Sequence, residues 1–136
     1  MGAWDVETFD NDTACDWTVE LEDSSDLSCV RQTLDEVVEM GDEYLDSDEA
    51  CRALAACEVI ARLKGNWGKR DAYSERVDKW VESHPQTPPA ELIELALKVI
   101  DRIRSEPSEL LELWEESDAA GWRKSVDDLR SRVERI

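Results

Sequence analysis

The chain has 136 residues, of which 37% are charged and 41% are hydrophobic, and its formal net charge is −18. This length and apolar content predict one globular domain with a single core and exclude an intrinsically disordered chain. The acidity repels nucleic acid, and no apolar run approaches the ~20 residues of a membrane span, so we expect no nucleic-acid or membrane partner.

The charge is unevenly distributed along the sequence. Residues 1–60 hold 18 of the 34 acidic residues but only two bases, Arg31 and Arg52, whereas residues 61–136 hold 16 acidic and 14 basic residues. The first half therefore creates nearly all of the negative field, which attracts cations or basic proteins. The alternative interpretation is salt adaptation, in which the acidity provides solubility in a salty cytoplasm and serves no specific ligand.

Other features of the sequence indicate the cellular compartment of the protein and the kinds of metal or catalytic site that it lacks. The acidic start lacks the basic and apolar regions of a signal peptide, which predicts a cytoplasmic protein. The four cysteines show no CxxC spacing, and with a single histidine there is no tight ligand cluster, so we expect free thiols, no metal and no cofactor. We assign no catalytic residue, because no serine elbow, phosphate loop or HExxH motif is present.

Helical patterns follow one another along the chain, with no convincing strand. They predict an all-α fold in which six or seven helices form one compact domain, residues 1–136, with a docked N-terminal segment. Large aromatic residues in 1–10 predict that this start packs on the fold, because free chain ends are usually frayed. The first helix begins near Asn11 or Asp12, which are good N-cap residues, and buries Trp17.

Cap and stop residues delimit the next two helices. The second is predicted to begin at Ser24 or Ser25 and to end at Gly41. The third opens at Asp46 with a capping box and ends at Gly65, and its many small side chains suit close helix packing.

Internal loops are expected at 65–73 and 84–88. Between them, residues 74–83 predict a fourth helix. The fifth helix takes Thr87 as its N-cap and Pro88 as its first residue, because proline is well tolerated at that position. Two further helices complete the chain, and the last of them is predicted to start at Asp118.

The six tryptophans divide into two groups. Four lie on apolar helical faces and are expected in the core: Trp17, Trp80, Trp114 and Trp122. The other two, Trp4 and Trp67, lie outside helices and are the better candidates for lining a groove, where a ring in an acidic cleft can hold a cationic group. Plugging of the core is the commoner use of such rings.

Both ends of the sequence carry recognisable stretches. The first comprises Gly2-Ala3-Trp4, Phe9-Asp10-Asn11-Asp12, Ala14 and Asp16-Trp17, and the second comprises Ser108-Glu109-Leu110, Leu113-Trp114-Glu115-Glu116-Ser117, Trp122 and Asp128-Leu129. Together they resemble a bacterial family catalogued only as domain of unknown function number 4259, which typically begins MGAWG. Asp5 stands where that family usually has glycine. The resemblance implies a small, mostly helical domain and brings no established activity.

The candidate binding residues gather near the start of the chain. Asp12, Asp16 and Glu20 are spaced four residues apart and form one acidic stripe on the first helix, where like charges cost a few tenths of a kcal/mol per pair. Water, salt or an arginine of the last helix can compensate this repulsion, and so can a divalent cation or a basic partner. The metal ligands to test are Asp10, Asp12 and Asp16. Asp10, Asn11 and Asp12 equally suit a helix cap, which is the interpretation we favour for them.

These observations lead to a candidate site and two hypotheses of function. The predicted binding residues are Trp4, Asp5, Asp10, Asn11, Asp12, Asp16, Glu20 and Trp67. The leading hypothesis is a binding protein whose acidic face engages a basic protein, as an immunity-type inhibitor or a nucleic-acid mimic does. The alternative is a small hydrolase or divalent-metal-dependent enzyme that uses the N-terminal carboxylates. An enzyme needs a concave pocket with convergent carboxylates, whereas a mimic needs a broad acidic surface.

Overall fold

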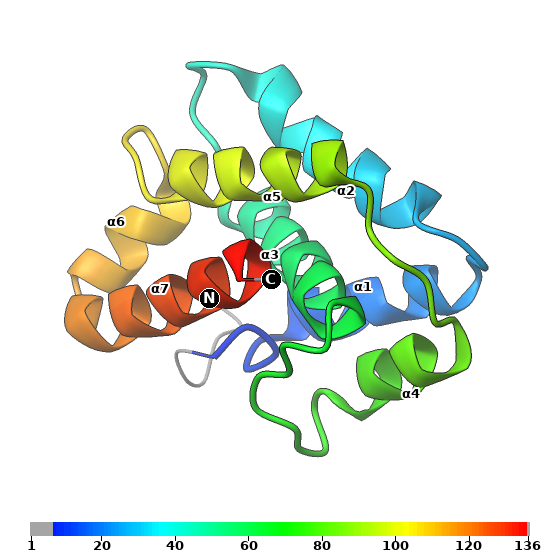
Figure 1. The fold of residues 1–136 in the computed structure, drawn as a ribbon. Helices are drawn as coiled ribbons and strands as arrows, with labels where there is room; N and C mark the ends of the chain where they lie inside the picture. The colour runs from blue at the N-terminus through cyan, green and yellow to red at the C-terminus, as the bar shows by residue number, and fades with distance from the viewer. Residues whose placement is uncertain (1–6, 136) are drawn as a thin grey trace.

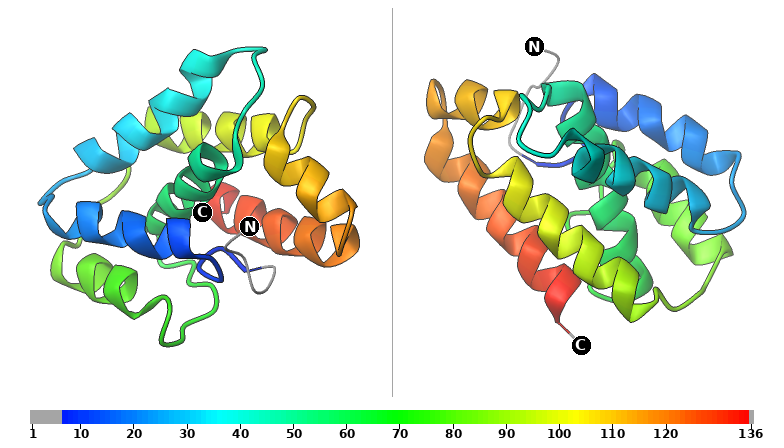
Figure 2. Two further views of the ribbon diagram at one scale, coloured as in Figure 1. Left: turned by 180° about the vertical axis from the view of Figure 1, so that it is seen from behind. Right: turned by 90° about the horizontal axis from the view of Figure 1, so that it is seen from above.

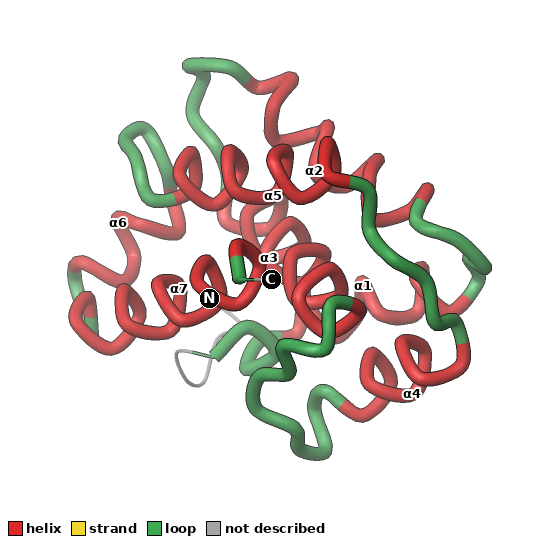
Figure 3. The backbone as a smooth tube through the Cα atoms, in the orientation of Figure 1, coloured by secondary structure: helices red, strands yellow, loops and turns green. Residues whose placement is uncertain are grey.

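A computed structural model describes residues 7–135 of the chain. Within that range the chain forms seven helices and no strand, which confirms the predicted all-α fold. An isolated parallel β-bridge joins Leu45 to Ser108. Figures 1 and 3 show one body in which α3 (Ser47–Leu63) runs through the centre and the other helices surround it.

Six helices contact α3. They are α1 (Asp12–Glu22), α2 (Ser28–Met40), α4 (Glu75–Ser83), α5 (Ala90–Ile103), α6 (Glu109–Glu115) and α7 (Ala119–Glu134). Figure 2 shows α5 and α7 side by side on one side of α3, with α1 on the other. Because α3 is rich in alanine, its neighbours approach closely, and it is buried from Ala53 to Arg62 without interruption.

Local side-chain chemistry fixes several helix ends where the sequence places them. The Asn11 side chain accepts a hydrogen bond from the Ala14 N–H at 2.8 Å and caps α1. The Asp46 carboxylate accepts one from the Glu49 N–H at 2.9 Å and caps α3, and Asp118 caps α7 in the same way. Each cap satisfies an N–H that has no partner inside its helix, which confirms these three predicted starts.

The predicted start of the second helix is wrong. α2 begins at Ser28 rather than at Ser24 or Ser25. The Asp26 carboxylate accepts hydrogen bonds from the Ser28 N–H at 3.0 Å and from the Ser28 hydroxyl at 2.6 Å. This local turn competes with helix and delays the first helical residue.

The predicted start of the fifth helix is also wrong. α5 begins at Ala90, and neither Thr87 nor Pro88 caps or opens it. The ring of Pro89 disfavours helical backbone at the preceding residue, and Pro89 is itself extended, with ψ of 150°. The paired prolines therefore lengthen the linker between α4 and α5.

The core contains the four tryptophans predicted for it. Trp17 is only 1% exposed, and its indole N–H donates to the Thr33 hydroxyl at 2.9 Å. Trp80 donates to the Ser24 carbonyl at 2.8 Å. Among the helices formed by residues 7–135, none combines the length and apolar character that a membrane crossing requires.

Candidate functional site

The predicted site residues do not form one cluster. Trp4 and Asp5 lie outside the described residues. Asp10 is buried, and its charge is the largest cause that raises the pKa of Lys69. Asn11 is buried as well, because its side chain caps α1 and donates to the Thr8 carbonyl at 3.0 Å. Both buried residues therefore contribute to the internal structure.

The acidic stripe is exposed along α1. Its three carboxylates form no hydrogen bond or ion pair with residues 7–135. An arginine of the last helix, one of the compensations that the sequence leaves open, does not pair with the stripe among residues 7–135, and the two arginines that form ion pairs there bind other carboxylates. Arg130 binds Asp101 at 2.9 Å, and Arg132 binds Glu58 at 2.7 Å. Within the described part of the chain, the stripe therefore has no internal counter-charge, which leaves solvent, salt, a cation or a partner to relieve its repulsion.

The two halves of the chain also differ in how many of their charged side chains form ion pairs. Of the acidic residues between positions 11 and 57, Glu22 alone forms an ion pair with a described base, at 3.2 Å from Arg76. The bases after residue 61 are largely used in ion pairs. Those that form them are Arg62, Lys69, Arg70, Arg76, Lys79, Arg104, Arg130 and Arg132.

The three acids of the stripe on α1 and the three acids along α2 form what we call the acidic face; Glu22, the other exposed acid of α1, is not part of it, because it pairs with Arg76. Its members are Asp12, Asp16, Glu20, Asp35, Glu36 and Glu39, and none pairs with a base of residues 7–135. The bases of the second half therefore do not neutralise the acidic face.

The carboxylates named as metal ligands do not converge. Asp10, which precedes α1, is buried, whereas Asp12 and Asp16 are exposed to solvent. Within the described part of the chain, no group of three or more His, Cys, Asp or Glu side chains is arranged to hold a metal ion. The geometry therefore offers no support for metal chemistry at these residues.

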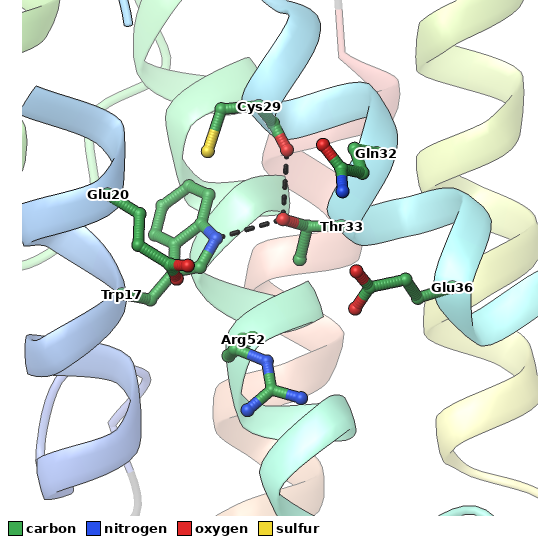
Figure 4. A pocket seen from close by; sticks show the side chains of 7 residues that line it. All are labelled: Trp17, Glu20, Cys29, Gln32, Thr33, Glu36 and Arg52. Carbon is green, nitrogen blue, oxygen red and sulfur yellow. Dashed lines mark hydrogen bonds between the residues drawn. The ribbon is translucent and has the colours of Figure 1, made fainter. Parts of the chain in front are cut away.

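A pocket of about 280 Å³ lies between α1, α2 and α3 (Figure 4). It is lined by Trp17, Glu20, Cys29, Gln32, Thr33, Glu36 and Arg52. Sequence reasoning identified Glu20 and missed the rest of the charged rim, because its members come from three helices. This pocket, which we call the rim pocket, opens within the acidic face.

The floor of the rim pocket is already hydrogen-bonded. Trp17 donates to the Thr33 hydroxyl, which in turn donates to the Cys29 carbonyl at 2.9 Å. Burial, followed by the charge of Glu20, raises the pKa of the Cys29 thiol and keeps it protonated. The floor thus gives the pocket its shape without offering a reactive group.

The rim carries the charges that lack partners. Glu20, Glu36 and Arg52 form no hydrogen bond or ion pair with the described residues, although Glu36 and Arg52 are half-buried. Figure 4 shows the Glu36 carboxylate turned toward the space between the helices. With two carboxylates and one guanidinium, the rim has one negative charge in excess.

A second charged cluster lies inside the protein, where α3, α4 and α7 meet. We call its members, Glu58, Arg62, Asp78 and Arg132, the buried ion network; each is at most 5% exposed. Arg132 binds Glu58 with two nitrogens, at 2.7 and 3.0 Å. Arg62 bridges Glu58 and Asp78, with 2.8 Å between its Nε and Oδ1 of Asp78. Two guanidinium groups thus balance two carboxylates, as burial requires.

The network also fixes the N-terminal segment and the loop after α3. Thr8 donates to Glu58 at 3.2 Å, and the Arg62 guanidinium lies 5.6 Å from the centre of the Phe9 ring. Trp67 is half-buried, with the Arg70 guanidinium 4.2 Å from its ring centre. The cationic group in contact with the Trp67 ring is therefore a guanidinium of the same chain.

Fold and surface together define a small, acidic, all-α domain. The model of the family described as Domain of unknown function (DUF4259) matches residues 2–125. The chain therefore belongs to this family, which confirms the resemblance seen at its two ends. Neither the curated proteins nor the solved structures include a match to the chain.

Proposed function

We propose that the protein is a cytoplasmic binding protein of a prokaryote, whose acidic face engages a basic protein partner. The observation that supports this is the absence of any internal ion pair for the six carboxylates of the acidic face within residues 7–135. A surface of one sign steers an oppositely charged protein toward it and speeds the encounter at low salt.

The exposed arrangement favours a protein surface over an enzyme. The carboxylates of the acidic face spread over two neighbouring helices, which is the broad distribution that an immunity-type inhibitor or a nucleic-acid mimic requires. No observation favours a hydrolase or metal enzyme at Asp10, Asp12 and Asp16, since these side chains do not converge.

Charge reversal within the acidic face tests the proposal. In the double variant Asp12→Lys, Asp16→Lys, we expect loss of the partner while the fold persists, as monitored by circular dichroism. The matched control is Glu115→Lys with Glu116→Lys, two exposed acids at the end of α6, away from α1 (Figure 1). It changes the net charge by the same amount.

The measurement is affinity capture from the native lysate with each of the three immobilised proteins at low and high salt. The proposal predicts one basic protein that the wild type and the control retain at low salt and release at high salt. Equal capture by all three proteins would contradict it. Loss from both variants would point to unspecific charge, as salt adaptation implies.

A further inference from the structure

The rim pocket allows the partner's contact to be specified further, on the basis of the proposed function. We propose that the rim pocket receives one arginine side chain of the basic protein partner. The size of the pocket, the sign and placement of its charges, and the lack of internal partners for those charges all fit such a side chain.

The volume fits a side chain. Small-molecule pockets in proteins typically enclose ~300–1,000 Å³. At about 280 Å³ the rim pocket falls just below that range, so it suits a guanidinium and its stem better than a cofactor-sized ligand.

The charges select a cation. Glu20 on α1 and Glu36 on α2 approach from two sides, and Arg52 leaves one negative charge in excess, so one monovalent cation neutralises the rim. Arginine presents a planar fork of donors that carboxylates bind with fixed geometry, whereas lysine is a compact, strongly hydrated charge.

The half-buried positions of Glu36 and Arg52 strengthen this assignment. Both have lost part of their hydration, and neither has a hydrogen-bond or ion-pair partner among residues 7–135. An incoming arginine supplies donors to the carboxylate without disturbing the floor, where Trp17 and Thr33 are already bonded to each other.

The test is an NMR titration with N-acetyl-arginine amide. The neutral isostere N-acetyl-citrulline amide serves as the matched ligand. We expect the arginine probe to shift the indole N–H signal of Trp17 in a saturable manner, because this group lies in the pocket floor. The indole signal of Trp114, a core residue of α6, should stay in place. The citrulline probe should leave both signals unchanged.

Matched variants then locate the contact. Glu36→Gln and Glu20→Gln should each weaken the binding of the arginine probe about threefold to tenfold, the loss expected when one partly hydrated charge-assisted contact is removed. Glu39→Gln, on the same helix but outside the pocket, should not change it.

Two results would overturn the inference: equal shifts with citrulline, or equal affinity in Glu36→Gln and Glu39→Gln. Capture of a basic protein without any shift by the arginine probe would overturn the pocket assignment and leave the proposed function standing. A specific shift without any basic partner would support the pocket and remove the proposed function.

Discussion

The acidic face and the buried ion network use the same residue types in opposite ways. In the network, Glu58 and Asp78 are nearly inaccessible, and each is bound by at least one guanidinium. On the acidic face, six carboxylates carry no internal ion pair within residues 7–135. Both arrangements occur within one chain of net charge −18.

The difference follows from hydration. A buried carboxylate without a partner costs several kcal/mol, so the fold persists only if each buried charge is balanced and hydrogen-bonded. Neighbouring like charges in water cost a few tenths of a kcal/mol per pair, which the core easily offsets. The network is therefore required by the fold, whereas the acidic face is free to serve a partner.

The largest effect should come from breaking the network. Arg62→Met keeps a long side chain but removes the guanidinium that bridges Glu58 and Asp78. Because both carboxylates stay buried, we expect a loss of about 3–5 kcal/mol in the free energy of unfolding. Urea denaturation followed by circular dichroism measures it.

The control lies on the surface of α7. Arg130→Met removes a guanidinium that binds Asp101 where both side chains are partly exposed, so its cost should be about 0–1 kcal/mol. If the Arg62 and Arg130 variants lose equal stability, the distinction between the two regions fails.

The parts of the fold that the sequence predicts well are those decided by neighbours along the chain. Asn11, Asp46 and Asp118 cap helices as expected because the acceptor and the donor lie three residues apart. The start of α2 was missed because Asp26 competes for the same backbone groups, and the spacing of apolar residues does not report that competition.

The candidate sites also differ in how far the sequence predicts them, depending on whether their residues are neighbours along the chain. The acidic stripe is a local pattern, and its exposure on α1 follows from spacing alone. The buried ion network is not local, since Glu58 and Arg132 are 74 positions apart. Its one signal in the sequence is the pair Glu58 and Arg62, four residues apart inside an alanine-rich helix, where charged side chains need a partner. The rim pocket has no such signal.

Neutralising a single surface acid should have a smaller effect on stability. The sign of this effect should differ between the two halves of the chain. Asp16→Asn removes the central charge of the stripe, and because Asp and Asn have similar helix propensity, stability at low salt should rise by a few tenths of a kcal/mol. Asp127→Asn removes an ion pair with Arg104 and should lower stability by up to about 1 kcal/mol.

Thermal unfolding at low and high salt measures both changes. The gain from Asp16→Asn should fade at high salt, because screening already relieves the repulsion in the wild type. A stability loss in Asp16→Asn at low salt would show that the stripe is compensated within the protein.

The smallest effect concerns Asp101, an exposed carboxylate of the second half that does have partners. Hydrogen bonds from the Arg130 guanidinium, at 2.9 and 3.1 Å, are the main cause that lowers its pKa, and Arg104 adds to the shift. A lowered pKa means that the stabilisation is present above the ordinary carboxyl value of ~3.9 and is lost as the pH falls through the folded-state pKa. With half of the Asp101 side chain exposed, this contribution is a fraction of a kcal/mol.

An NMR titration of the Asp101 carboxyl carbon between acidic and neutral pH reads this pKa directly. Arg130→Met should move it upward toward the ordinary value, and Arg123→Met, which removes an exposed base of the same helix that forms no ion pair with residues 7–135, should leave it in place. An unchanged pKa in Arg130→Met would mean that general charge, rather than this contact, sets the titration of Asp101. The two halves of the chain would then differ in the number of bases they carry and not in how those bases are used.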